Sequence, residues 1–130
     1  MVQDKTTTAL VLEDEMFIAM DIEEVLADAG VTKILSFPAC AQAIDYLRTN
    51  TPDVAVIDFH LHGVTCLPVA EILAERKVPT VIHSGNHYEE GYHGIFFKRF
   101  PWVMKPSSAT ELADALELAR LGVGEAKLEN

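Results

Sequence analysis

Short apolar runs alternate along the chain with segments in which apolar residues recur every three or four positions. The runs are rich in Val, Ile, Leu and Ala, as buried strands are, and the longer spacing is typical of amphipathic helices. The expected strands are residues 9–12, 33–36, 54–58, 80–83 and 102–104. The expected helices cover 16–29, 40–48, a stretch around 69–73 and a last segment that starts at 108. This alternation predicts an α/β fold in which helices cover both faces of a parallel sheet.

Two of the expected helices carry clear end signals. Gly30 follows the first amphipathic segment and is a typical residue after a helix C-terminus, whereas Ser108 and Glu111 have the spacing of a capping box at the start of the last helix. The segment from Gly85 to Pro101 lacks a clean helical period. We therefore expect a short or irregular helix in that segment.

Charge and length narrow the class of protein. The 130 residues include 20 Asp and Glu against 10 Lys and Arg, so the formal net charge is −10. Phosphate groups would be repelled, which disfavours direct binding to nucleic acid or to an anionic membrane and favours the binding of cations. No apolar run is long enough to span a membrane, and the N-terminus lacks a signal-peptide pattern. A single domain in the cytoplasm is the expectation.

The two cysteines are Cys40 and Cys66. They are far apart in the sequence and belong to no paired motif, so a disulfide is not expected. We expect both to be small side chains on helix faces, which fits a reducing compartment.

Reactive side chains follow four of the expected strands. Glu13 and Asp14 follow the first strand, Asp58 ends the third, and Ser84 and Lys105 follow the fourth and fifth. Ligands of open α/β sheets bind at the carboxyl ends of the strands, so we expect these five side chains to meet. Converging carboxylates repel one another unless a cation joins them, and Mg²⁺ prefers such oxygen ligands. A carboxylate can also attack phosphorus to give an aspartyl phosphate, which a lysine, a hydroxyl and a metal ion would stabilise.

The motifs in this order and spacing resemble the receiver domain of two-component response regulators. They are Leu12-Glu13-Asp14-Glu15, Val56-Ile57-Asp58, Ser84-Gly85 and Lys105-Pro106. The resemblance covers residues 8–121 and leaves 1–7 and 122–130 as short tails, so no output domain is expected. It implies a doubly wound, flavodoxin-like sheet of five parallel strands in the order 2-1-3-4-5.

The resemblance also implies an acidic magnesium site. Asp58 would accept the phosphoryl group. Asp14 and Asp58 would bind Mg²⁺ directly, together with the backbone carbonyl of His60, and Glu13 would act through water.

Further roles follow on the phosphoryl side of the site. Ser84 would form a hydrogen bond to the phosphoryl group and Lys105 would contact it directly. The Lys105–Pro106 peptide falls where the family has a cis peptide bond, and Trp102 falls where it has a switching aromatic residue. Two interpretations of Trp102 stay open, a rotamer switch and a packed residue at the sheet edge.

The sequence departs from the family pattern at several positions. Ser107 stands where an aromatic residue usually follows Lys-Pro, and residues 83–88 are similar to a single-domain subgroup that carries Phe-Ala-Thr-Gly followed by an aromatic residue. His60 and His62 replace the usual proline-glycine pattern after Asp58. Histidine is a common ligand of zinc and copper, so these two residues have two interpretations, a transition-metal site and ordinary surface histidines.

The resemblance implies a stand-alone phosphoacceptor rather than an enzyme with multiple turnover. Its partners would be a sensor histidine kinase or phosphotransfer protein and a downstream protein target, because no output domain is expected to read the signal. One alternative is an interaction module that keeps the fold without phosphorylation. Another is an aspartyl-phosphate phosphohydrolase, in which His60 stands two residues after the nucleophile, where that class needs an Asp as general acid. The sequence leaves the cognate kinase, the lifetime of the phosphorylated state and the oligomeric state undetermined.

Overall fold

The computed structural model describes residues 6–58, 60–61, 64–85 and 100–122. Its main sheet has five parallel strands in the order β2-β1-β3-β6-β7. The strands are β1 (Thr8–Leu12), β2 (Lys33–Phe37), β3 (Val54–Ile57), β6 (Thr80–Ser84) and β7 (Trp102–Met104). The predicted order 2-1-3-4-5 is confirmed, since β6 and β7 are the fourth and fifth strands of this sheet.

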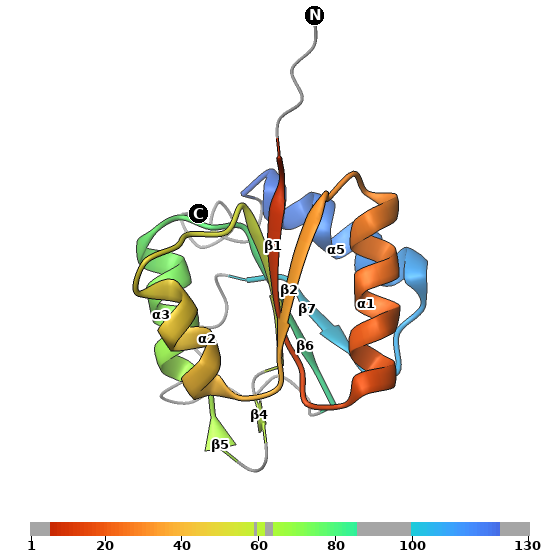
Figure 1. Cartoon of the computed structure of the whole chain (residues 1–130). Helices are drawn as coiled ribbons and strands as arrows, with labels where there is room; N and C mark the ends of the chain where they lie inside the picture. Colours follow the sequence, from red (N-terminus) through yellow and green to blue (C-terminus); the bar gives the residue numbers. More distant parts are fainter. Residues whose placement is uncertain (1–5, 59, 62–63, 86–99, 123–130) are drawn as a thin grey trace, which may run out of the picture.

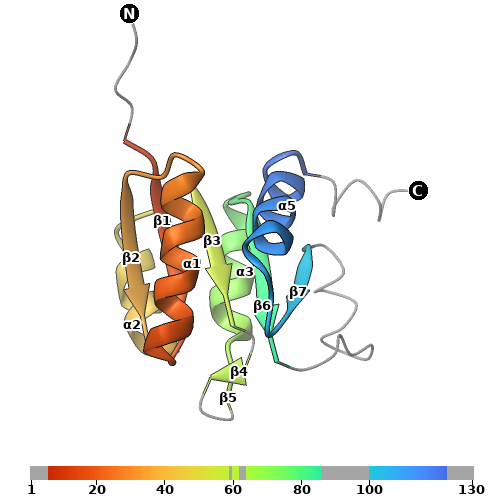
Figure 2. The same cartoon turned by 90° about the vertical axis from the view of Figure 1, so that its right-hand side faces the viewer.

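Helices cover both faces of the sheet (Figures 1 and 2). The helices are α1 (Met16–Asp28), α2 (Cys40–Leu47), α3 (Leu67–Glu75) and α5 (Ala109–Arg120). One core lies between the sheet and α2 with α3, and the other lies between the sheet and α1 with α5. Leu10 and Leu12 of β1 point into the first core, whereas Ala9 and Val11 point into the second. The central strand is therefore apolar on both sides, as expected for a buried parallel sheet.

The predicted helix ends are confirmed by their hydrogen bonds. Gly30 has a φ of +100° and follows the C-cap of α1, where its N–H donates to the Ala27 carbonyl at 3.0 Å and the Val31 N–H donates to the Leu26 carbonyl at 3.0 Å. This is the Schellman arrangement, which favours glycine at the left-handed position. At the start of α5, the Ser108 hydroxyl accepts from the Glu111 N–H at 3.0 Å and the Glu111 carboxylate accepts from the Ser108 N–H at 2.8 Å.

The segment between β3 and α3 forms structure that the sequence pattern did not predict. Strands β4 (His60–Leu61) and β5 (Val64–Thr65) pair antiparallel as a small separate sheet beyond the edge of the main one (Figure 1). They are too short to carry a recognisable alternation. The expected irregular helix between Gly85 and Pro101 falls mostly on residues 86–99, which lie outside the described residues.

The cysteine prediction was wrong. Cys40 and Cys66, 26 positions apart, are joined by a disulfide with a Cα–Cα separation of 5.9 Å. Cys40 is the first residue of α2 and Cys66 is the N-cap of α3. The two helices pack side by side on one face, so the fold brings together two starting points that the linear sequence keeps apart.

In the described part of the chain no helix is long and apolar enough to cross a membrane.

Candidate functional site

The pairing of the central strands places the acidic residues next to one another. Leu12 of β1 is in register with Ile57 of β3, and the Asp58 N–H donates to the Leu12 carbonyl at 2.9 Å. The Glu13 N–H donates in turn to the Phe37 carbonyl of β2 at 3.0 Å. The ends of three adjacent strands are thus tied together, and the carboxylates emerge at one edge.

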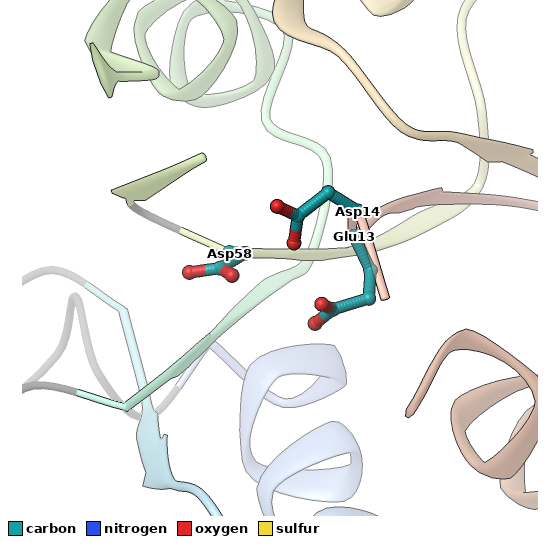
Figure 3. Close-up of side chains that lie close together, drawn as sticks. All are labelled: Glu13, Asp14 and Asp58. Atoms are coloured by element: carbon teal, nitrogen blue, oxygen red, sulfur yellow. The ribbon is translucent and has the colours of Figure 1, made fainter. Parts of the chain in front are cut away.

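Glu13, Asp14 and Asp58 form an acidic cluster. Each offers a carboxylate oxygen, and these three oxygens lie within 4.8 Å of one another. Figure 3 shows the three carboxyl groups gathered where β1 and β3 end. Glu13 and Asp58 are buried, whereas Asp14 is partly exposed and leaves the cluster open to solvent on its side. This set of hard oxygen donors fits Mg²⁺, which binds through one or two carboxylates and keeps several waters.

Lys105 is the cation of the site. Its Nζ lies 2.8 Å from Asp58 Oδ2 and 2.8 Å from Glu13 Oε1. Its backbone N–H donates to the Ser84 carbonyl at 2.9 Å, which holds the residue at the end of β6, and the Lys105–Pro106 peptide is cis as expected. One ammonium group therefore bridges two of the three carboxylates.

Burial and pairing act in opposite directions on these charges. Burial raises the pKa of Glu13 and outweighs the lowering effect of the Lys105 hydrogen bond. Burial alone would lower the pKa of Lys105, but its hydrogen bonds and attraction to Asp58 and Glu13 together raise it. The lysine thus stays charged, and a divalent cation near Glu13 would favour the ionised carboxylate.

The other predicted site residues have mixed outcomes. Ser84 is buried at the carboxyl end of β6, beside the lysine, as expected. Trp102 is partly buried on β7, in register with Ile82, and packs against the core on the α2–α3 side, so both interpretations of its role stay open. The backbone of His60 lies in β4, and its role as a carbonyl ligand stays a prediction. His62 lies outside the described residues.

The structure reveals one polar pair that the sequence analysis missed. His83, 4% exposed on β6, forms a 2.9 Å hydrogen bond through Nε2 to Ser107 Oγ, and its Nδ1 has no hydrogen-bond partner within the described residues. Burial, with a smaller contribution from the Lys105 charge, lowers the pKa of His83 to about 4. The only signal in the sequence was a histidine inside an apolar strand and a serine in place of an aromatic residue.

Solved structures share this fold. The chain is 31% identical to SdrG from Sphingomonas melonis Fr1, with a TM-score of 0.75 over 89% of this chain and 97% of that one. A CheY-like receiver domain from Methylobacillus flagellatus matches with a TM-score of 0.72 at 21% identity, over 88% of this chain and 99% of that one.

Curated relatives match over a shorter part of their own length. The positive alginate biosynthesis regulatory protein of Pseudomonas aeruginosa is 25% identical over 113 residues, which is 85% of this chain and 46% of that protein. A protein-glutamate methylesterase/protein-glutamine glutaminase of Natronomonas pharaonis is 27% identical over 84 residues, 64% of this chain and 23% of that protein. The chain thus spans about half or less of the length of these relatives. The family model of the response regulator receiver domain matches residues 9–117. On the fold, the acidic cluster and this match, the chain belongs to the response regulator receiver domain family.

Proposed function

We propose that this receiver accepts a phosphoryl group on Asp58 from a histidine kinase or phosphotransfer protein, with Mg²⁺ bound, and passes the signal on by protein contact. The observation that carries the proposal is the convergence of Glu13, Asp14 and Asp58 within 4.8 Å, with Lys105 Nζ 2.8 Å from Asp58 Oδ2. A purely structural ion pair would need only one of these acids. The alternative of a module without phosphorylation is not favoured, because it gives this cluster no use.

The chemistry needs one nucleophile and a group that holds the transferred charge. An Asp58 oxygen attacks phosphorus and forms the P–O bond while the P–N bond to the donor imidazole breaks, and the imidazole leaves as the neutral base after it gains a proton. Lys105 Nζ already donates a hydrogen bond to Asp58 Oδ2, and it would pair with the negative charge that the phosphoryl group adds. The acceptor in this reaction is Asp58, a residue of the chain itself. We therefore propose a switch rather than an enzyme with multiple turnover.

Asp14 and Asp58, with the His60 carbonyl, would hold Mg²⁺ directly, and Glu13 would hold it through water. When bound, Mg²⁺ neutralises the charge that develops on the phosphoryl oxygens. Ser84, buried beside Lys105, would then donate its hydroxyl to a phosphoryl oxygen. Phosphorylation adds nearly two negative charges at this edge, and Trp102 on the neighbouring strand is our candidate for the residue that changes rotamer in response.

An exposed apolar patch supports a protein as the phosphoryl donor. Met16, Phe17 and Met20 lie on the first turns of α1, directly after the acidic cluster, and the Phe17 side chain is 79% exposed. Large apolar side chains grouped on a surface are typical of binding sites for proteins. The donor would therefore cover α1 while its phosphorylated histidine reaches Asp58.

Two finer parts of the proposal concern the kind of receiver. We keep the expectation of a stand-alone receiver of the Phe-Ala-Thr-Gly-aromatic subgroup, for which Ser84-Gly85 and Pro101 are the supporting residues. The expected cytoplasmic location and the absence of direct nucleic-acid and membrane binding belong to the proposal as well.

Labelling with radioactive acetyl phosphate tests the acceptor. The wild type should be labelled in Mg²⁺ and lose the label on chelation, whereas Asp58→Asn should take up none. Asp45→Asn removes the same charge from the exposed face of α2 and should leave labelling unchanged. Label that survives Asp58→Asn would refute the assignment.

A second comparison tests the donor surface. Phe17→Ala should slow transfer from a phosphorylated histidine protein and leave labelling by acetyl phosphate unchanged, because only the protein donor needs the patch. Leu118→Ala, at an exposed apolar position on α5, is the matched control. Equal transfer to Phe17→Ala and the wild type would remove α1 from the proposed interface.

A further inference from the structure

The disulfide between Cys40 and Cys66 lies at the same edge of the fold as the acidic cluster. Cys40 follows the carboxyl end of β2, and Cys66 ends the segment that starts at Asp58. Within the described residues the chain has no other cysteine, and the full sequence contains two. The bond thus joins the starts of α2 and α3, and α3 is the helix into which the phosphoacceptor segment leads.

The bond restrains one of the two ends of this segment. The first end is held at Asp58 by the hydrogen bond from its N–H to the Leu12 carbonyl. The second end is Cys66, bonded through sulfur to α2. Between them lie β4 and β5, which pair with each other and, among the described residues, not with the main sheet (Figure 2). Opening the disulfide would therefore remove the covalent tie at the far end, which would then be held only by core packing and by the 3.3 Å hydrogen bond from the Ala70 N–H to the Cys66 carbonyl, while Asp58 keeps its place.

The rest of α3 would stay packed after reduction. Val69, Ala70 and Leu73 are fully buried in the core between the helix and the sheet. This packing does not depend on the sulfur bond, so loss of the bond should change the restraint on the Asp58 segment rather than unfold the helix.

The two sulfurs differ in access and in chemical surroundings. Cys66 is 0% exposed, whereas Cys40 is partly exposed, so an external thiol reaches Cys40 first. Cys66 then leaves as the thiolate at the N-cap of α3, a helix that has no side-chain cap hydrogen bond in the disulfide form. Helix N-termini stabilise thiolates through their free N–H groups and the helix dipole. Here Pro68 has no N–H to offer, so the cap position points to the N–H of Val69.

We propose that Cys40 and Cys66 form a reversible redox site that controls how tightly the acidic cluster binds Mg²⁺. The disulfide form fixes Cys66 against α2, so the chain that leads from Asp58 to α3 has less conformational entropy to lose on metal binding. The reduced dithiol form lacks this covalent restraint at Cys66 and binds Mg²⁺ more weakly. If the difference between the two forms equals the backbone conformational entropy of one residue, their Mg²⁺ affinities differ about tenfold.

Oxidation by a low-molecular-weight disulfide balances without any other reactant. The Cys40 thiolate attacks one sulfur of that disulfide, forms a mixed disulfide and expels a thiolate. The Cys66 thiolate then attacks Cys40 Sγ, closes the protein disulfide and expels the second thiolate. Two electrons pass from the protein to the small disulfide, and the two protons lost by the cysteines appear on the released thiols.

The first measurement establishes reversibility. The folded protein is treated with dithiothreitol, freed of it, and then treated with glutathione disulfide, and free thiols are titrated after each step. The expected result is two free thiols after reduction and none after reoxidation, with a circular dichroism spectrum that stays the same. Thiols that do not close again, or reduction that unfolds the chain, would overturn the proposal in favour of a purely structural bond.

The second measurement tests the link to the metal site. Mg²⁺ is titrated into each form and followed by the fluorescence of Trp102, the only tryptophan in the chain, and acetyl-phosphate labelling is measured at low and at saturating Mg²⁺. The disulfide form should bind Mg²⁺ about tenfold more tightly. It should also be labelled faster at low Mg²⁺, while the two rates converge at saturation. Cys40→Ser and Cys66→Ala should each behave as the reduced wild type does and show no response to the oxidant.

The outcomes separate this proposal from the proposed function, on which its phosphorylation arm rests. Equal Mg²⁺ affinities in the two forms would overturn the redox proposal and leave Asp58 phosphorylation intact. No labelling in either form would refute the proposed function, while a tenfold difference in Mg²⁺ affinity would still support the redox site. A difference between reducing and oxidising conditions that persists in Cys40→Ser would assign the effect to the reagents and overturn the proposal.

Discussion

His83 provides a direct test of how burial controls the stability of this fold. Its ring is buried on β6, and its pKa is lowered to about 4 by burial and, to a smaller extent, by the charge of Lys105. In the unfolded chain the same ring has a pKa of about 6.5. Between these two values the unfolded chain binds a proton that the folded protein does not.

The sign of the pH effect follows from this difference in bound protons. Above pH 6.5 the ring is neutral in both states, and the full stability is present. As the pH falls below 6.5 the unfolded state gains a proton, so the free energy of unfolding decreases until the folded ring also titrates near pH 4. The difference between the two pKa values of His83 lowers the free energy of unfolding by about 3 kcal/mol in total. About 2 kcal/mol of this decrease falls between pH 7 and pH 5.

Urea unfolding at pH 7 and pH 5 measures this loss in the wild type and in His83→Leu. The variant keeps the volume and the apolar face but cannot bind a proton, so it should lose about 2 kcal/mol less than the wild type on going to pH 5. The raised pKa of Glu13 acts in the opposite direction, because a folded state that binds a proton more readily is stabilised by acid. That effect is common to both proteins and cancels in the comparison. If the two proteins lose the same free energy to within about 0.5 kcal/mol, the inference that His83 is buried in its neutral form is wrong.

Three further predictions concern the site and the helix that follows it. Lys105→Met leaves Glu13 and Asp58 buried without their shared cation, so the free energy of unfolding at neutral pH should fall by about 3 kcal/mol. Added Mg²⁺ should restore part of this loss. Urea unfolding that does not change in the variant would contradict the ion-pair geometry. Mg²⁺ at about 100 times its dissociation constant should stabilise the wild type by about 2.7 kcal/mol in thermal unfolding, and Asp14→Asn should remove most of that gain if Asp14 is a ligand. Ser108→Ala should cost about 1 kcal/mol because it removes the cap of α5, whereas Thr110→Ala in the same exposed first turn should cost little in the same urea assay.

Much of the fold followed from local pattern alone. The apolar run of β1 and the spacing of Ile18, Ile22 and Val25 predicted a strand and a helix whose observed bounds differ by one residue at most. The alternation of such elements restricts the chain to a parallel sheet, because parallel strands need a crossover between them. The members of the acidic site could be named from the sequence for the same reason, since each of them follows a strand.

The pairings across the fold were not visible in the sequence. Residues far apart in the chain meet only through strand order and helix packing. For this reason the sequence predicts Cys40 and Cys66 as helix-face residues without a disulfide, and it gives no sign of the His83–Ser107 hydrogen bond. The choice of Lys105 as the bridge between two buried carboxylates likewise depends on β1, β3 and β7 ending at one edge. The sequence by itself determined the elements and the chemical groups at their ends, because both depend on local periodicity. Tertiary structure alone decided which groups touch and which of them are buried, because both depend on contacts between distant segments.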